Sequence, residues 1–268
     1  MAKPFKTYEE LLLFLQDEKN LTIEDMNTAR RILLKTSYFS LISGYKDTFK
    51  NPTTGKYIDG TTFDDIYRLY QFDNELRSIF LKYILIAEHS VKSSLAYHFS
   101  ATYGEDQKEY LSLSHYMIAG SSQKKIQKII SIFQYQLKRN SEYAYINHYK
   151  SKHHNVPLWI MIFLSIMTKH RNVCAHGDRF FNYRTKDSIT DTVIHEKLHI
   201  PQISGRYQMG KNDLFSEVII LKYLLDKEDF RNFYYELKTC LKKQVPGEDI
   251  LALMGFPDNW MAILRMKC

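Results

Sequence analysis

An arginine and a histidine five positions apart are the residues of this sequence best suited to chemistry. Arg171 is followed at once by Asn172, and His176 comes four positions after the asparagine. A guanidinium neutralises the charge of a phosphodiester, and an imidazole exchanges protons near neutral pH. Asn172 and His176 share a helix face, so the amide can orient the imidazole. We therefore predict phosphodiester chemistry at this motif.

The segment that must position the motif is an apolar helix within residues 157–182. At roughly 100° per residue, the residues from 166 onward separate into two faces. The face predicted to pack in the core carries Ile166, Met167, His170, Val173 and Cys174. The opposite face carries Thr168, Arg171, Asn172, Ala175 and His176. Arg171 and His176 lie about 140° apart and flank a polar groove that contains Asn172 and the small Ala175.

A structural explanation of the same residues is a helix end at which His176 caps the last carbonyl groups and Arg171 pairs with a carboxylate. The context favours the chemical explanation. This Arg-His pair ends the most apolar helix of the chain, and the sequence continues through Asp178 to a further cation, Arg179. Asp178 and Arg179 are therefore predicted to support the motif.

The string RNVCAHGDRFFN at residues 171–182 resembles the R-(polar)-x3-H signature of the HEPN superfamily. Over most of its length the chain is similar to the Abi-like proteins of bacterial abortive infection, the AbiD/AbiF group. The similar stretches are 35–39, 42–45, 63–67, 72–77, 87–92, 157–159 and 210–215. One departure is the short spacing between Pro157 and Arg171, where family members usually carry a longer helical insert.

The resemblance implies an all-α fold, with a HEPN-like helical bundle and an N-terminal helical extension. It implies a metal-independent endoribonuclease of toxin type in phage defence that needs no cofactor. The catalytic residues are then Arg171, Asn172 and His176, and RNA supplies its own nucleophile, the 2′-OH. HEPN nucleases pair two motifs across a dimer, so the single motif implies a homodimer with Ala175 at the contact. A small structured non-coding RNA is a further implied partner, as regulator or antitoxin.

One alternative from a different class is a non-catalytic HEPN-like module that binds RNA or dimerises. In that case Arg171 and His176 only bind the phosphate groups of RNA, and the purified protein binds RNA without cleaving it.

The composition limits the class of protein. The chain has 268 residues, is 44% hydrophobic and contains only 10 glycines and 6 prolines, which favours a helical protein of one large or two small domains. Its net charge of +7 fits an anionic partner such as nucleic acid without requiring one. Three widely spaced cysteines and the lack of a signal peptide or long apolar run predict a cytoplasmic protein with no membrane contact.

The order of elements predicts an N-terminal helical arm, residues 1–50, and a helical body, residues 51–268. A turn at residues 51–55 separates them. The longest helical pattern runs from residue 62 to 103, as one helix or as two joined by a kink near Asp73. Glu88 lies in its apolar half, where it is either a buried pairing partner or the group that orients Arg171.

Five basic residues lie along a predicted helix that ends at residue 139. They are Lys124, Lys125, Lys128, Lys138 and Arg139. One interpretation is a solvated helix face. The other is contact with the phosphates of RNA.

The string His195-Glu196-Lys197-Leu198-His199 matches the H-E-x-x-H pattern of zinc hydrolases. On a helix both histidines would reach one metal ion. Pro201 disfavours helix just before it, and we predict extended or loop structure on both sides of the string. A zinc hydrolase is thus the less favoured alternative, and Glu217, farther along the chain, is expected to be a surface residue.

Overall fold

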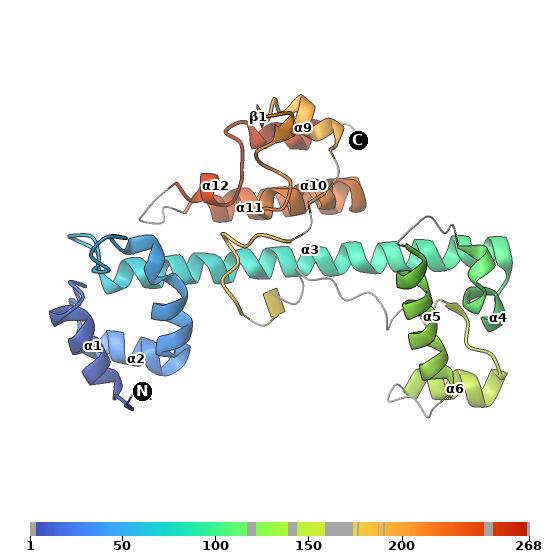
Figure 1. The fold of residues 1–268 in the computed structure, drawn as a ribbon, viewed down its shortest axis with the longest axis horizontal. Helices are drawn as coiled ribbons and strands as arrows, with labels where there is room; N and C mark the ends of the chain where they lie inside the picture. The colour runs from blue at the N-terminus through green and yellow to red at the C-terminus, as the bar shows by residue number, and fades with distance from the viewer. Residues whose placement is uncertain are drawn as a thin grey trace. The chain divides into compact units, whose positions relative to one another are not determined.

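The computed structural model describes residues 4–116, 122–138, 144–158, 174–175, 177–186, 188–189, 191–243 and 249–266. Across these residues the chain is mostly helical, with one two-stranded antiparallel sheet (Figure 1). The predicted all-α fold class is therefore confirmed. No helix in the described ranges combines the length and apolar character needed to cross a bilayer.

The chain divides into two compact units. The first contains residues 1–84 and 170–268, and the second contains residues 85–169. Helix α3, Phe63–Tyr103, is one continuous helix of 41 residues without the alternative kink near Asp73, and it contributes residues to both units. The predicted division into residues 1–50 and 51–268 stays a prediction.

The first unit contains most of the helices. Its described elements besides the first part of α3 are α1 (Tyr8–Asp17), α2 (Met26–Thr36), a π-helical turn η1 (Phe39–Ser43), the 3-10 turn η2 (Lys46–Phe49), α9 (Val193–Lys197), β1 (Gln202–Ile203), β2 (Arg206–Tyr207), α10 (Leu214–Leu224), α11 (Lys227–Leu241), α12 (Ile250–Leu253) and the 3-10 turn η5 (Trp260–Arg265). In the sheet, Gln202 pairs with Tyr207 and Ile203 pairs with Arg206.

Local sequence explains where several of these helices begin. The Thr7 backbone N–H donates to the Glu10 carboxylate at 2.7 Å and the Glu10 N–H donates to the Thr7 hydroxyl at 3.2 Å, which together form a capping box at the start of α1. The Asp25 carboxylate accepts the Asn27 and Thr28 N–H groups and caps α2. The beginnings of both helices are therefore set by residues next to them in the sequence.

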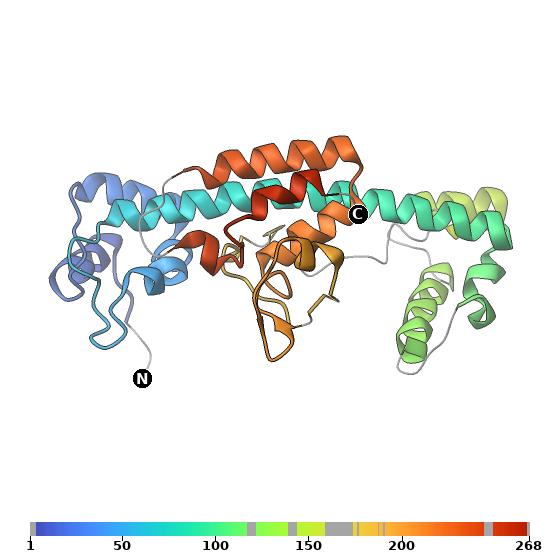
Figure 2. The ribbon, with the colours of Figure 1, turned by 90° about the horizontal axis from the view of Figure 1, so that it is seen from above.

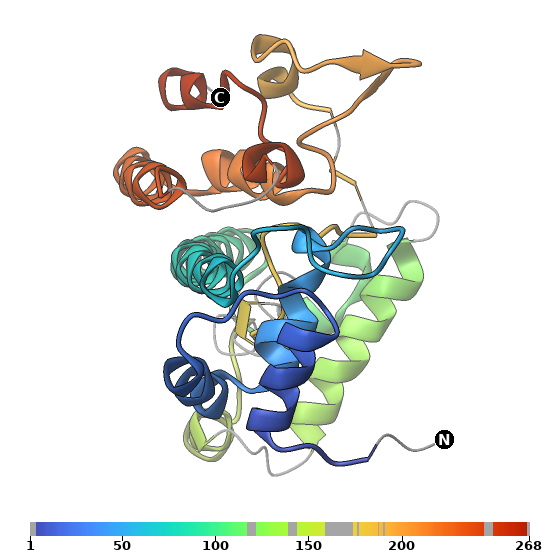
Figure 3. The same ribbon diagram turned by 90° about the vertical axis from the view of Figure 1, so that its left-hand side faces the viewer.

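Aromatic rings connect the first part of α3 to the rest of this unit. The ring of Phe80 lies 5.3 Å from that of Phe180 and 5.3 Å from that of Phe233 on α11, in edge-to-face geometry. Figures 2 and 3 show α11 running alongside α3, as these contacts require. Phe80 and Phe180 are fully buried. The chain just after the Arg-His motif is thus part of the core.

The second unit has a smaller core of its own. Its described elements besides the end of α3 are α4 (Gln107–Leu111), the 3-10 turn η3 (Leu113–His115), α5 (Ser122–Lys138) and α6 (Ala144–His153). The core contains Tyr110, Phe133, Ile146, Val156 and Leu158. The Tyr110 hydroxyl donates to the Val156 carbonyl at 2.6 Å, which satisfies the polar end of this buried ring.

Two expectations from the sequence were wrong. The residues before His195 form the helical turn α9, whereas extended or loop structure was expected there. Glu217 was expected at the surface, but its side chain is buried. The reason is that α10 is buried on almost every side from Leu214 to Ile219, so it has no polar face that could hold this residue in solvent.

Candidate active site

The predicted catalytic residues Arg171, Asn172 and His176 lie outside the described residues. Within the motif the structure describes Cys174 and Ala175, and both are helical. Cys174 is buried, with 7% of its surface exposed, whereas Ala175 is exposed. These two neighbours therefore occupy the core and solvent faces that the helical wheel predicts for them.

The thiol of Cys174, two positions before the predicted catalytic histidine in the sequence, is disfavoured as a nucleophile. Burial raises the pKa of Cys174 to about 12, so the thiol stays protonated at neutral pH. The charges of Arg77, Asp73 and Glu217 also act on this thiol. Cysteine-histidine catalysis is thus disfavoured at the motif, and the side chains that remain for chemistry are on the opposite face.

A glycine in the left-handed region follows the motif directly. Gly177 has a φ of 72°, a backbone conformation that is typical of the residue just past a helix end. The chain then continues in non-helical conformation through Asp178, Arg179 and Phe180. The described helical residues Cys174 and Ala175 are therefore followed, from Gly177 onward, by chain that is not helical.

A buried carboxylate holds the chain just after this glycine. Asp73 on α3 is fully buried and accepts four hydrogen bonds. Two come from side chains, the Tyr45 hydroxyl at 2.6 Å and the Arg77 guanidinium at 2.7 Å. The other two come from the backbone N–H groups of Phe180, at 3.0 Å, and Phe181, at 2.7 Å. We call Tyr45, Asp73, Arg77 and the backbone of residues 178–181 the Asp73 cluster.

The Asp73 carboxyl is held as a carboxylate in this cluster. Burial raises its pKa above the usual range, while the hydrogen bonds from Tyr45, Arg77 and the two N–H groups act in the opposite direction. The buried Arg77 guanidinium, 2.7 Å away, would lack a counterion if Asp73 were protonated, so we assign the charged form. Burial alone would lower the pKa of Arg77, but the charge of Asp73 raises it above its usual value.

Arg77 links the same carboxylate to the backbone after the motif. Its guanidinium donates to the Asp178 carbonyl at 2.9 Å and also contacts the Asn74 side-chain oxygen. It lies four residues after Asp73, on the same face of α3, which is the spacing of a helical ion pair. Asp178 thus contributes to the cluster through its carbonyl group, while its carboxylate has no role there.

Arg179, predicted to support the motif, contacts the N-terminal region of the chain. Its guanidinium donates to the Gly44 carbonyl at 3.0 Å and lies 4.0 Å from the Asp47 carboxylate. Gly44 and Tyr45 belong to one of the family-like stretches, and Asp73 and Arg77 belong to another. The residues of both stretches therefore meet the chain that follows the motif.

The sequence predicted Asp178 and Arg179 but missed the residues that hold them. A usable signal was present, because Asp73 and Arg77 have ion-pair spacing inside an apolar helical pattern, where an unpaired charge would be unfavourable. Glu217 was also missed. It is a buried carboxylate whose charge acts on the Cys174 thiol. The expectation that it lies at the surface gave no reason to place it near the motif.

Glu88 forms a local ion pair. Its carboxylate lies 3.6 Å from the Lys92 ammonium, one turn farther along α3, and only 9% of its side chain is exposed. The interpretation of Glu88 as a largely buried pairing partner agrees with this geometry. Its predicted role in orienting Arg171 involves a residue outside the described ranges and stays a prediction.

The predicted RNA-binding lysines lie on α5. Lys124, Lys128 and Lys138 are exposed, while the side chain of Lys125 and all of Arg139 lie outside what the structure describes. At roughly 100° per residue the three exposed lysines fall within an arc of about 80°, opposite the buried Phe133. This arrangement forms one basic stripe, and both a solvated face and an RNA contact fit it.

The H-E-x-x-H string has a structural role in place of a metal-binding one. The Thr192 N–H donates to His195 Nδ1 at 3.1 Å, and His195 Nε2 lies 2.8 Å from the Gly210 carbonyl. His195 is buried and both ring nitrogens are in use, whereas His199 is exposed with a φ of 49°. In the searched part of the chain, no three His, Cys, Asp or Glu side chains group as metal ligands.

Comparison with known proteins identifies the family. A family model described as Abi-like protein matches residues 31–167. This match covers just over half of the sequence, and the chain belongs to the Abi-like protein family. Membership suggests a role in abortive-infection defence against phage. The matched region contains Asp73 and Arg77 but ends before Arg171. Searches among curated proteins and among solved structures returned no match.

Proposed function

We propose that this protein is a metal-independent endoribonuclease of abortive-infection phage defence, of the HEPN superfamily and the AbiD/AbiF group. The observation that carries the proposal is the Asp73 cluster, which fixes the backbone two residues after His176 with a buried ion pair. Burying two charges is expensive unless they are well paired and hydrogen-bonded. A site that must present two side chains to one phosphate benefits from such rigid support.

The proposed chemistry uses only groups of the protein and of the RNA. One base removes the proton of the 2′-OH, and the oxygen attacks the adjacent phosphorus as the bond to the 5′-oxygen breaks. An acid protonates that 5′-oxygen as it leaves. His176 supplies the acid or base function, Asn172 orients its ring, and Arg171 stabilises the charge that develops on the phosphoryl oxygens. The products are a 2′,3′-cyclic phosphate end and a 5′-OH end.

The direct test is incubation of the purified protein with mixed RNA in EDTA, followed by mapping of the product ends. We expect cleavage to persist in EDTA and to leave 2′,3′-cyclic phosphate and 5′-OH ends. His199→Ala should cleave at the wild-type rate, and the purified protein should lack stoichiometric zinc. One zinc ion per chain that is lost in this variant would support the hydrolase alternative. RNA binding without any cleavage would support the non-catalytic module.

We further propose that the active form is a homodimer. A monomer presents one arginine and one histidine to the phosphate, whereas a two-fold dimer brings two copies of the same helix face together. Two histidines can then divide the acid and base roles. Ala175 is exposed on the helical part of the motif, and its small side chain would allow close approach of the partner helix.

Ala175→Trp tests this dimer. The indole points away from the core and should block the approach of the two helices while each chain stays folded. We expect cleavage to fall by about 10²-fold or more, because the general acid–base pair is no longer assembled. The circular dichroism spectrum should be unchanged. Ala252→Trp, at an exposed alanine of α12, is the matched control and should remain active. A fully active wild-type monomer, sized by light scattering, would contradict the model.

The proposal also assigns RNA contacts outside the motif. Lys124, Lys128 and Lys138 form the basic stripe on α5, and together with Lys125 and Arg139 they would neutralise phosphates of the substrate. A small structured RNA remains a proposed regulator or antitoxin. The reaction is proposed to take place in the cytoplasm.

A further inference from the structure

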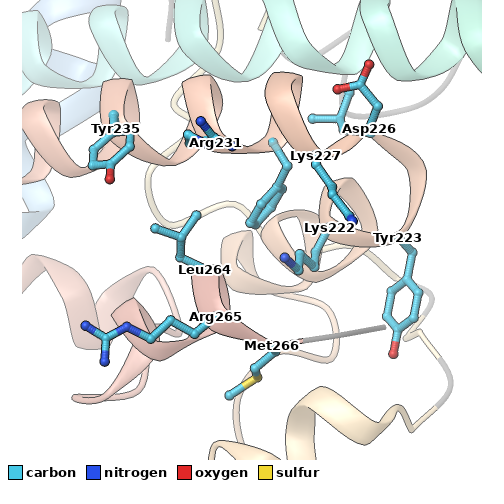
Figure 4. Close-up of a pocket in the computed structure, with 11 residues that line it drawn as sticks. Lys222, Tyr223, Asp226, Lys227, Arg231, Tyr235, Leu264, Arg265 and Met266 are labelled. Carbon is cyan, nitrogen blue, oxygen red and sulfur yellow. The ribbon is translucent and has the colours of Figure 1, made fainter.

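A hollow of about 740 Å³ lies in the C-terminal part of the first unit, and no residue of the Asp73 cluster lines it. Its walls come from the end of α10, the first half of α11 and the last turn, η5 (Figure 4). The volume is within the range of about 300–1,000 Å³ that small-molecule sites occupy. The hollow is therefore large enough for a ligand the size of a nucleotide.

Cations dominate the lining of this hollow. Lys222, Lys227, Arg231 and Arg265 all contribute, against a single carboxylate, that of Asp226. Among the described residues, no carboxylate forms an ion pair with Lys227, Arg231 or Arg265 within 4.0 Å. Like charges gathered around one hollow repel each other, and an anionic ligand removes that repulsion.

The one carboxylate of the lining is already engaged. Asp226 is the N-cap of α11, and its Oδ1 accepts the backbone N–H of Asp229 at 2.8 Å. Its charge therefore serves the helix N-terminus, where the macrodipole also favours it. The other acidic residues of this turn, Glu228 and Asp229, do not line the hollow. The four cations of the lining therefore face one carboxylate that is already hydrogen-bonded.

Aromatic rings line the same hollow. Tyr223 is 45% exposed and Tyr235 is 52% exposed, so both offer ring surface to a ligand. Phe230 is buried, and the Lys222 ammonium lies 4.4 Å from the centre of its ring. This cation–π contact holds the Lys222 side chain against the wall of the hollow. Stacking on aromatic rings beside basic groups is how proteins bind single nucleotide units without reading their sequence.

We propose that this hollow is a second, non-catalytic site that binds a nucleoside phosphate, with the phosphates on the basic side chains and the base against Tyr223 or Tyr235. The ligand is either a free nucleotide or the 5′-phosphorylated end of an RNA strand, since both present the same chemistry. None of the residues that line the hollow belongs to the Arg171 and His176 motif. Its existence does not depend on the proposed nuclease activity.

The test measures binding by isothermal titration calorimetry in EDTA and near-physiological salt. The probes are ATP and a six-residue, 5′-phosphorylated RNA with 2′-O-methyl groups, which has no 2′-OH to attack and so survives any cleavage activity. The same oligonucleotide with a 5′-OH end serves as its control. Binding of ATP identifies free nucleotides as the source, and binding of the 5′-phosphorylated oligonucleotide alone identifies RNA ends.

Lys227→Gln/Arg231→Gln removes two of the lining charges from exposed positions. We expect at least a tenfold loss of affinity for the probe that binds, at about 1.4 kcal/mol per factor of ten. Lys238→Gln/Lys242→Gln removes the same amount of charge from the last turn of α11 and the residue just after it, and this variant should bind as wild type does. The inference is overturned if neither probe binds, if the 5′-OH oligonucleotide binds equally well, or if the two double variants behave alike.

Discussion

His176→Ala is expected to lower the rate of RNA cleavage by about 10²–10⁴-fold, the factor that general acid–base catalysis typically supplies. Arg171→Ala should have an effect of similar size, because the charge developing on the phosphoryl oxygens loses its partner. Both residues fall on the predicted face opposite the buried Cys174, so core packing is retained. The measurement is single-turnover cleavage of a labelled RNA, with the melting temperature recorded for each variant.

His98→Ala provides the matched control, since this histidine is exposed and belongs to α3 in the second unit. It should cleave at the wild-type rate. Mixing His176→Ala subunits with Arg171→Ala subunits adds a second criterion, because a heterodimer keeps one histidine and one arginine and should regain part of the activity. Wild-type cleavage by both single variants would refute the proposed catalytic site.

Asp73→Asn should destabilise the fold by about 3–5 kcal/mol, the typical effect of removing one partner of a buried ion pair. The amide has the size of the carboxyl group but no charge. Its NH₂ group takes the place of one carboxylate oxygen and cannot accept the hydrogen bonds that this oxygen now accepts. Arg77, only 5% exposed, then keeps a buried charge without a counterion. Urea unfolding followed by circular dichroism measures the loss.

The control for this prediction lies on the same helix. Asp64 and Arg68 form an ion pair with the same i,i+4 spacing and a distance of 2.7 Å, but both side chains are 58% exposed. Exposed pairs contribute little to stability, so Asp64→Asn should unfold at nearly the wild-type urea concentration. Equal effects of the two substitutions would mean that the Asp73 cluster has no special role in stability.

Long helices of this fold were predictable from local pattern. Residues 63–103 show apolar spacing of about 3.6 without proline or internal glycine, and the structure has one helix there. The question of a kink near Asp73 could not be answered from the sequence. Asp73 interrupts the apolar pattern, and only its buried partners show that the charge is part of the core.

The candidate site was predictable only in part. The helical period assigned Cys174 to the core and Ala175 to solvent, because both assignments depend on neighbours a few positions away. The Asp73 cluster depends on hydrogen bonds between groups 107 and 108 positions apart, which no local pattern encodes. The prediction that Glu217 lies at the surface was wrong for a related reason, since its burial follows from helix packing on several sides.

The separation of the two halves of the Asp73 cluster also determines when, during synthesis, the site can form. At about 5–20 residues per second, a ribosome that has added Asp73 needs roughly 5–20 s to reach Phe181. Throughout that interval the carboxylate has no backbone partners, and the segment that carries the motif is not yet anchored. The proposed nuclease activity, which in our proposal depends on this cluster, is therefore expected to be absent while most of the chain is being translated.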